Sequence, residues 1–113
     1  MQIPNAHRAV IESVKLHGYL LSGSHSVGRF KAPFFLTLGY SAEDWPRLEA
    51  DFRTQHLSQD ATLGERTRYG QTYEIRATLV GPSGRSAEVV SAWIVRSGED
   101  FPRFVTAYPE GGR

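Results

Sequence analysis

The spacing of apolar residues changes part-way along the chain, and this change constrains the fold more than any other feature. In residues 72–80, "TYEIRATLV", apolar and polar side chains alternate. A two-residue period is typical of a strand with one buried face. Apolar residues before residue 58 recur at helical spacing instead. The sequence therefore predicts helices in the first half of the chain and strands in the second.

Three segments of the first half are expected to be helical. Residues 3–18 carry apolar side chains at helical spacing, and Asn5 could act as the N-cap. Residues 29–39 form a shorter second helix. Residues 41–57 are the clearest case, because Ser41 can cap this helix. An apolar stripe runs along one side of this helix: Trp45, Leu48 and Phe52.

Strands are expected at residues 72–80, 85–96 and 103–109, with a shorter strand before them at 64–70. Short glycine-containing turns separate them, which implies antiparallel pairing, because parallel strands need a long crossover. We therefore predict an α+β fold, with N-terminal helices packed on a C-terminal antiparallel sheet of about four strands. Trp93 is expected on a central strand.

Length and composition limit the classes of function. The 113 residues suit a single domain, 1–113. The absence of cysteine excludes a disulfide framework and a thiolate metal site. With 13 basic and 12 acidic residues there is no overall cationic field, so any anion site must be local. No apolar run approaches the roughly 20 residues that span a bilayer, and no signal peptide is evident. We expect a cytoplasmic location without membrane association.

The loop "HSVGRFK" is the first candidate site. His25 lies among flexible residues, and histidine titrates near neutrality. Gly28 would let the backbone approach an anion closely. Arg29 and Lys31 would lie at a helix entrance, where the helix end also attracts anions. The same composition fits an ordinary solvated loop, so the loop alone leaves both interpretations open.

The last strand is the second candidate. Alternation places Thr106 and Tyr108 on one face, with Phe104 beside them as a stacking surface. Arg103, at the start of the strand, could turn toward either side. Thr and Tyr are also common on the outer face of a sheet, so this interpretation remains equally open.

The other histidines show no spacing typical of a metal site, and no nucleotide-binding loop is present, so no metal or cofactor is expected. His7 and His56 are expected to be solvated on helix faces. His17 is expected near a helix C-terminus, where its charge is favourable.

Motifs at both ends of the chain are similar to those of a bacterial family. "VKLHGYLLSGSHSVGRFKAPFFLTLGY" is similar to the first part of its pattern, and "YGQTY", "SAWIV" and "PRFVTAYP" to its closing strands. The resemblance extends from Ile3 to Pro109. Close relatives are C-terminal domains of polymorphic bacterial toxins, which resemble the metal-independent ribonucleases of the barnase–EndoU–colicin–RelE superfamily. The resemblance implies helices against a four-stranded antiparallel sheet.

The resemblance also implies roles for individual residues. The catalytic residues would be His25, as general acid or base, Lys31, Thr106 and Tyr108. The phosphate-binding residues would be Arg29 and Arg103, and Trp93 would stack on a base. Ser26 stands where the family commonly has proline, and Pro33 stiffens the second helix, so both could change the pose of the loop.

The resulting hypothesis is a metal-independent endoribonuclease-like toxin domain. Its substrate would be RNA, with tRNA among the candidates, cut by attack of the ribose 2′-hydroxyl on the adjacent phosphorus. A cognate immunity or antitoxin protein would be its partner. Two alternatives remain: a non-catalytic RNA- or protein-binding domain of the same fold, and an interaction domain of a toxin–antitoxin pair. The low net charge favours the alternatives, because RNA-binding domains are often strongly basic.

Overall fold

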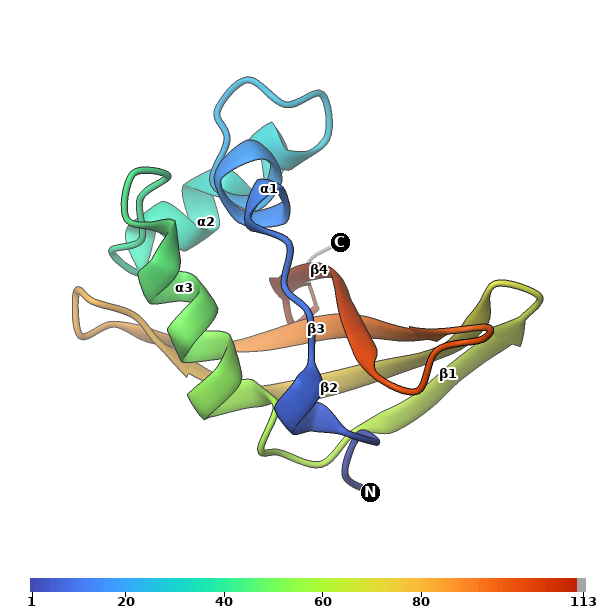
Figure 1. Cartoon of the computed structure of the whole chain (residues 1–113). Coiled ribbons are helices and arrows are strands. Elements are labelled where there is room, and N and C mark those ends of the chain that lie inside the picture. Colours follow the sequence, from blue (N-terminus) through green and yellow to red (C-terminus); the bar gives the residue numbers. More distant parts are fainter. Residues whose placement is uncertain (112–113) are drawn as a thin grey trace.

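In the computed structural model, which describes residues 1–111, helices precede a four-stranded antiparallel sheet (Figure 1). The helical elements, in which η marks a 3₁₀ or π turn, are η1 (Ala6–Arg8), α1 (Ser13–Lys15), η2 (Leu16–Leu20), η3 (Gly28–Phe30), α2 (Ala32–Thr37), α3 (Trp45–Asp51) and η4 (Phe52–His56). The strands are β1 (Thr62–Thr67), β2 (Gly70–Val80), β3 (Ser86–Arg96) and β4 (Pro102–Pro109), in the spatial order β1-β2-β3-β4. The predicted α+β fold is confirmed.

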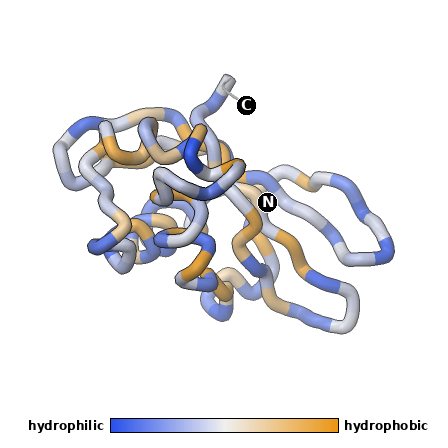
Figure 2. The backbone as a smooth tube through the Cα atoms, turned by 90° about the horizontal axis from the view of Figure 1, so that it is seen from above, coloured by the Kyte–Doolittle hydropathy of each residue, from blue (hydrophilic) through white to orange (hydrophobic). Residues whose placement is uncertain are grey.

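One face of the sheet is buried under the helices. Trp93, on the central strand β3 as predicted, packs edge-on against Phe104 of β4 with ring centroids 5.2 Å apart. Phe104 in turn contacts Phe52 of η4, also at 5.2 Å. Aromatic pairs of this kind contribute about 0.5–1.5 kcal/mol each beyond the area they bury. The loops that project on the right of Figure 2, away from this core, have hydrophilic to neutral tips.

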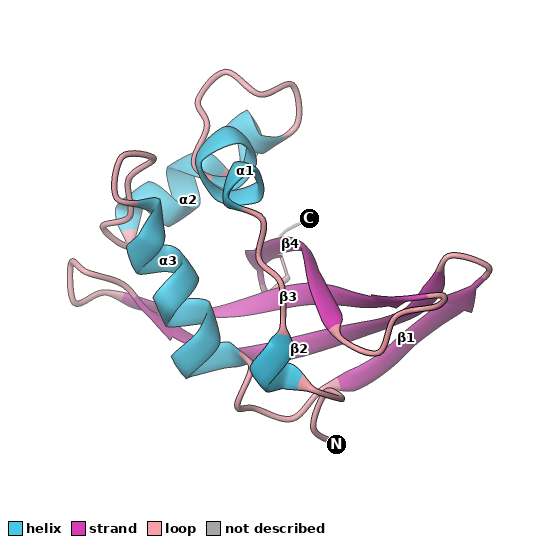
Figure 3. Ribbon diagram, in the orientation of Figure 1, coloured by secondary structure: helices cyan, strands magenta, loops and turns pink. Residues whose placement is uncertain are grey.

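The N-terminal segment covers the β4 edge of the sheet rather than forming a long helix (Figure 3). Val10 donates its N–H to Pro102 O and accepts from Phe104 N, both at 2.9 Å. This pairing needs an extended backbone, so the helix begins only at Ser13. The prediction that Asn5 caps a helix over residues 3–18 is therefore wrong. Its side chain bonds to the carbonyl of Asp100 instead. No helix within residues 1–111 is long and apolar enough to cross a membrane.

His56 is fully buried, and the prediction that it is solvated is wrong. It stands one helical turn after Phe52, so it continues the apolar stripe of α3 and η4. Its Nδ1 lies 2.8 Å from Ser91 Oγ, and Ser91 Oγ also accepts a hydrogen bond from Trp93 Nε1. Nε2 has no hydrogen-bond partner among the described residues. Burial lowers the pKa of His56 to about 4.

Candidate functional site

A cavity of about 530 Å³ opens between α1, η2, the loop at residues 21–27 and β4. Its volume lies within the range of small-molecule sites. It is lined by Val14, Lys15, Gly18, Tyr19, His25, Val27, Val105 and Thr106. Two of the four residues expected to be catalytic, His25 and Thr106, therefore share one cavity, although they are far apart in the sequence.

A β-bulge in β4 decides which side chains face this cavity. In the pairing of β3 with β4, Phe104 lies opposite Trp93 and Thr106 lies opposite Ala92, so Val105 is an inserted residue. The insertion shifts the alternation by one position: Phe104 turns into the core, whereas Thr106 is only half-buried and borders the cavity. The prediction that Phe104 lies on the same face of β4 as Thr106 and Tyr108 is therefore wrong. Bulges commonly re-aim side chains next to binding sites.

Tyr19 connects the two walls of the cavity. Its hydroxyl lies 2.9 Å from Thr106 Oγ1. Its ring packs edge-on against the imidazole of His25, with centroids 5.1 Å apart. Sequence reasoning missed Tyr19, and the available signal was its place in the "YLL" motif just before the His25 loop.

The hydrogen bonds of His25 determine which nitrogen carries its proton. Nδ1 accepts the backbone N–H groups of Val27 and Gly28, each at 3.0 Å. A nitrogen that accepts hydrogen bonds carries no proton, so the proton of the neutral ring is on Nε2. In this arrangement His25 can donate a hydrogen bond from Nε2–H. It cannot act as a proton shuttle unless the loop releases Nδ1.

Gly28 allows the His25 loop to lie against η2. A Cβ atom on this residue would lie 1.9 Å from the carbonyl oxygen of Tyr19. We expect Gly28→Ala to lower the free energy of unfolding by about 1–3 kcal/mol, because the loop must move away. Gly23→Ala is the matched control, since nothing lies within 4 Å of a Cβ there. Urea unfolding compares the two variants, and equal effects would show that the close approach is unimportant.

A second group of polar residues lies beside the cavity. Lys31 Nζ is 5.6 Å from the ring centroid of Tyr108. The Tyr108 hydroxyl donates to Glu74 Oε2 at 3.2 Å, and Arg76 Nη2 lies 3.3 Å from the other oxygen of Glu74. Lys31 and Tyr108 therefore lie close together. Tyr108 is two residues after Thr106 on β4, but neither Lys31 nor Tyr108 lines the cavity. Glu74 and Arg76 were missed, although they occupy the polar positions of β2.

Three expected site residues lie elsewhere. Arg29 is exposed and stacks on the ring of Phe30, at 4.5 Å. Arg103 makes two hydrogen bonds to Glu99, at 2.9 and 3.0 Å, which hold the pKa of that carboxyl below its usual value. Neither arginine lines the cavity. Trp93 is fully buried in the core, so its ring is not open to a base, and the assignment of base stacking is corrected.

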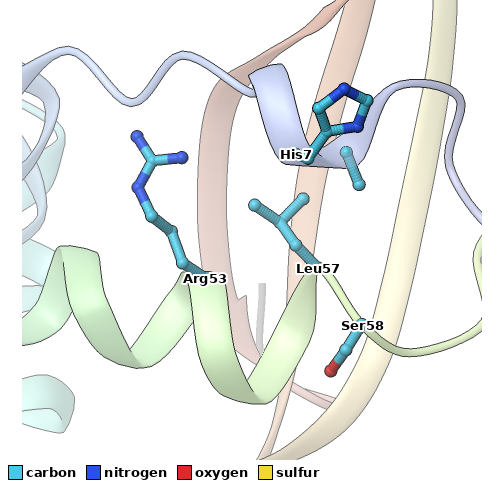
Figure 4. Close-up of a pocket in the computed structure, with 5 residues that line it drawn as sticks. His7, Arg53, Leu57 and Ser58 are labelled. Carbon is cyan, nitrogen blue, oxygen red and sulfur yellow. The ribbon is translucent and has the colours of Figure 1, made fainter.

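Another cavity, of about 240 Å³, is less suited to a polar ligand (Figure 4). It is lined by Ala6, His7, Arg53, Leu57 and Ser58. Leu57 lies between Arg53 and His7. The guanidinium of Arg53 is already held by Glu49 and by the carbonyl of Ala9. The polar groups that line this smaller cavity do not converge, so the cavity at His25 is the stronger candidate for the functional site. Among residues 1–111, no three histidine or acidic side chains converge as a metal site would require.

Comparisons with known proteins agree with this architecture. Residues 2–111 match a domain of unknown function, DUF6883. The chain belongs to the DUF6883 family. The fold of this DUF6883 chain is also similar to a chain in a contact-dependent growth inhibition toxin–immunity protein complex from Klebsiella pneumoniae 342. The TM-score is 0.66 and the identity 21%, over 92% of this chain and 95% of that chain. No match was found among curated proteins.

Proposed function

We propose that this DUF6883 domain is a toxin domain that cuts RNA without a metal ion. The observation that carries the proposal is the cavity at β4, which brings His25 together with Thr106, Tyr19 and Lys15. None of its eight lining residues is acidic, so it suits an anion such as a phosphate. The similar fold in a toxin–immunity protein complex supports a toxin role and a cognate immunity protein as partner.

The reaction we propose is attack of the ribose 2′-hydroxyl on the adjacent phosphorus, with cleavage of the bond to the 5′-oxygen. The Nε2–H of His25, the hydroxyl of Thr106 and the ammonium of Lys15 would bind the phosphoryl oxygens, where negative charge develops. This role for His25 follows from its hydrogen bonds at Nδ1 and replaces the role of general acid or base.

The 2′-oxygen must lose one proton, and the leaving 5′-oxygen must gain another. We assign the removal of the first proton to the carboxylate of Glu74, acting through the Tyr108 hydroxyl that is hydrogen-bonded to it. We assign the supply of the second to the ammonium of Lys31, which lies over the ring of Tyr108. Proton exchange with water afterwards returns Glu74 to its carboxylate form and Lys31 to its ammonium form. These groups lie beside the cavity, so the substrate would extend from the cavity toward Tyr108.

The proposal is tested by incubating the protein with a panel of RNAs, including tRNA, in the presence of a chelator. We expect cleavage products whose 3′ ends are 2′,3′-cyclic phosphates, which resist phosphatase until acid opens the ring. Cleavage that requires a divalent ion, or products with a 3′-hydroxyl, would contradict this mechanism. RNA that is bound but left intact would support the non-catalytic alternative.

An immunity-type role is the second candidate, because the complex with the similar fold contains both a toxin and an immunity protein. A protein of this kind would bind a toxin and would neither bind nor cut the RNA panel.

A further inference from the structure

The cavity at His25 has apolar lining residues that phosphate binding leaves unexplained. Val14 from α1 and Val27 from the loop are 57% and 51% exposed, yet both line this cavity. Single exposed aliphatic side chains are common on protein surfaces. These two come from separate elements and line the same cavity, so each offers apolar surface to a ligand bound there. Gly18, which also lines the cavity, adds no side chain to it.

The polar residues that line the cavity offer mainly hydrogen-bond donors. The ammonium of Lys15 lies 3.4 Å from the carbonyl of Val105, which leaves further N–H groups of the ammonium for a ligand. The hydroxyls of Tyr19 and Thr106 share one hydrogen bond, so one O–H is left to donate. His25 adds its Nε2–H. These donors together therefore fit an anion with several acceptor oxygens.

A ligand that contacts both the valines and the donors combines an apolar part with an anionic group, and a nucleotide does so. We infer that the cavity binds one nucleotide of an RNA chain, with the base against Val14 and Val27 and the phosphate against Lys15 and Thr106. The volume of about 530 Å³ leaves room for a base beside the phosphate. The inference rests on the proposed function for its choice of ligand, but nucleotide binding does not require that the protein cuts RNA.

The probes for the experiment are uridine 3′-monophosphate and adenosine 3′-monophosphate, compared with ribose 5-phosphate and inorganic phosphate, which lack a base. Titrations are followed by the amide signals of Val14 and Val27 in two-dimensional NMR spectra. We expect at least one nucleotide to bind about 5- to 10-fold more tightly than ribose 5-phosphate, because its base buries apolar surface.

Two variants test the role of the valines without changing the net charge. Val14→Asn and Val27→Asn are each expected to weaken nucleotide binding about 5-fold and to leave the binding of inorganic phosphate unchanged. Val80→Asn is the matched control, because Val80 is 45% exposed and lies outside the cavity. It should bind every probe as the unsubstituted protein does.

Several results would overturn the inference: equal affinity for nucleotides and inorganic phosphate, no binding of any probe at about 10 mM, or nucleotide binding that neither valine variant weakens. The outcome is separable from that of the proposed function. If nucleotides bind through the valines but no RNA is cut, the nucleotide site stands and the ribonuclease proposal fails. If RNA is cut but nucleotides bind independently of the valines, the nucleotide site fails and the ribonuclease proposal stands.

Discussion

Replacement of His25 by asparagine is expected to lower the rate of RNA cleavage by about 10²- to 10³-fold while the loop keeps its structure. The Oδ1 atom of asparagine can accept the N–H groups of Val27 and Gly28 that Nδ1 accepts in the native protein. The Nε2–H group, which binds the phosphate in the proposed reaction, is lost, and removal of one such donor typically costs this much in kcat. Single-turnover cleavage rates and urea unfolding, measured on the same preparation, separate the two effects.

Two further variants complete this test. His25→Ala should lower the cleavage rate by the same factor as His25→Asn. It should also destabilise the loop, because two backbone N–H groups lose their acceptor. His7→Ala should cut RNA at the native rate, since His7 is exposed and lies outside the cavity of His25. Cleavage by His25→Asn at the native rate would show that His25 only shapes the loop.

Acidification is expected to destabilise the protein through His56 by about 2–3 kcal/mol between pH 7 and pH 4.5. Burial lowers the pKa of this residue to about 4, from 6.5 in the unfolded chain, and the backbone of Ala77 and the Glu88 carboxylate oppose the shift only partly. Between these two values the unfolded chain binds a proton that the folded protein excludes. The stability is therefore complete above pH 6.5 and falls as the pH decreases toward 4. One pKa unit corresponds to about 1.4 kcal/mol.

The control for this prediction is His56→Asn, which can keep a hydrogen bond to Ser91 but does not titrate. Its free energy of unfolding should be lower at pH 7, because a smaller side chain leaves a cavity. It should then change less with pH than that of the native protein, and the difference between the two curves isolates His56. Parallel curves for the two proteins would show that His56 does not cause the acid sensitivity.

Local features were predictable from the sequence because they depend on residues close together in the chain. The two-residue period of residues 72–80 lies within β2, and Trp93 lies on a central strand. The prediction that Ser41 caps the third helix was only close: the N-cap of α3 is Asp44, without a side-chain hydrogen bond, and Ser41 Oγ accepts the N–H of Asp44 at 3.2 Å in the turn just before it. Periodicity within a strand needs no knowledge of distant contacts.

The N-terminal segment and β4 were not predictable in the same way, because contacts distant in the sequence shape both. Helical spacing of apolar residues before Ser13 reflects burial of an extended segment that pairs with β4 through Val10. Strict alternation along β4 assumes an unbroken ladder, and the bulge at Val105 breaks it. Nothing in either local sequence indicates which strand it will meet.

The same distinction between local and long-range determinants applies to the candidate site. The sequence by itself determined the supply of reactive groups: an imidazole in a glycine-rich loop, a lysine near it, and hydroxyls on the last strand, since side-chain chemistry belongs to each residue. Only the tertiary structure decided which of these groups meet. Packing placed His25 with Thr106 through Tyr19, enclosed Trp93 in the core and paired Arg103 with Glu99. Burial and partners depend on the whole chain, because they arise only when helices and sheet close around a common core.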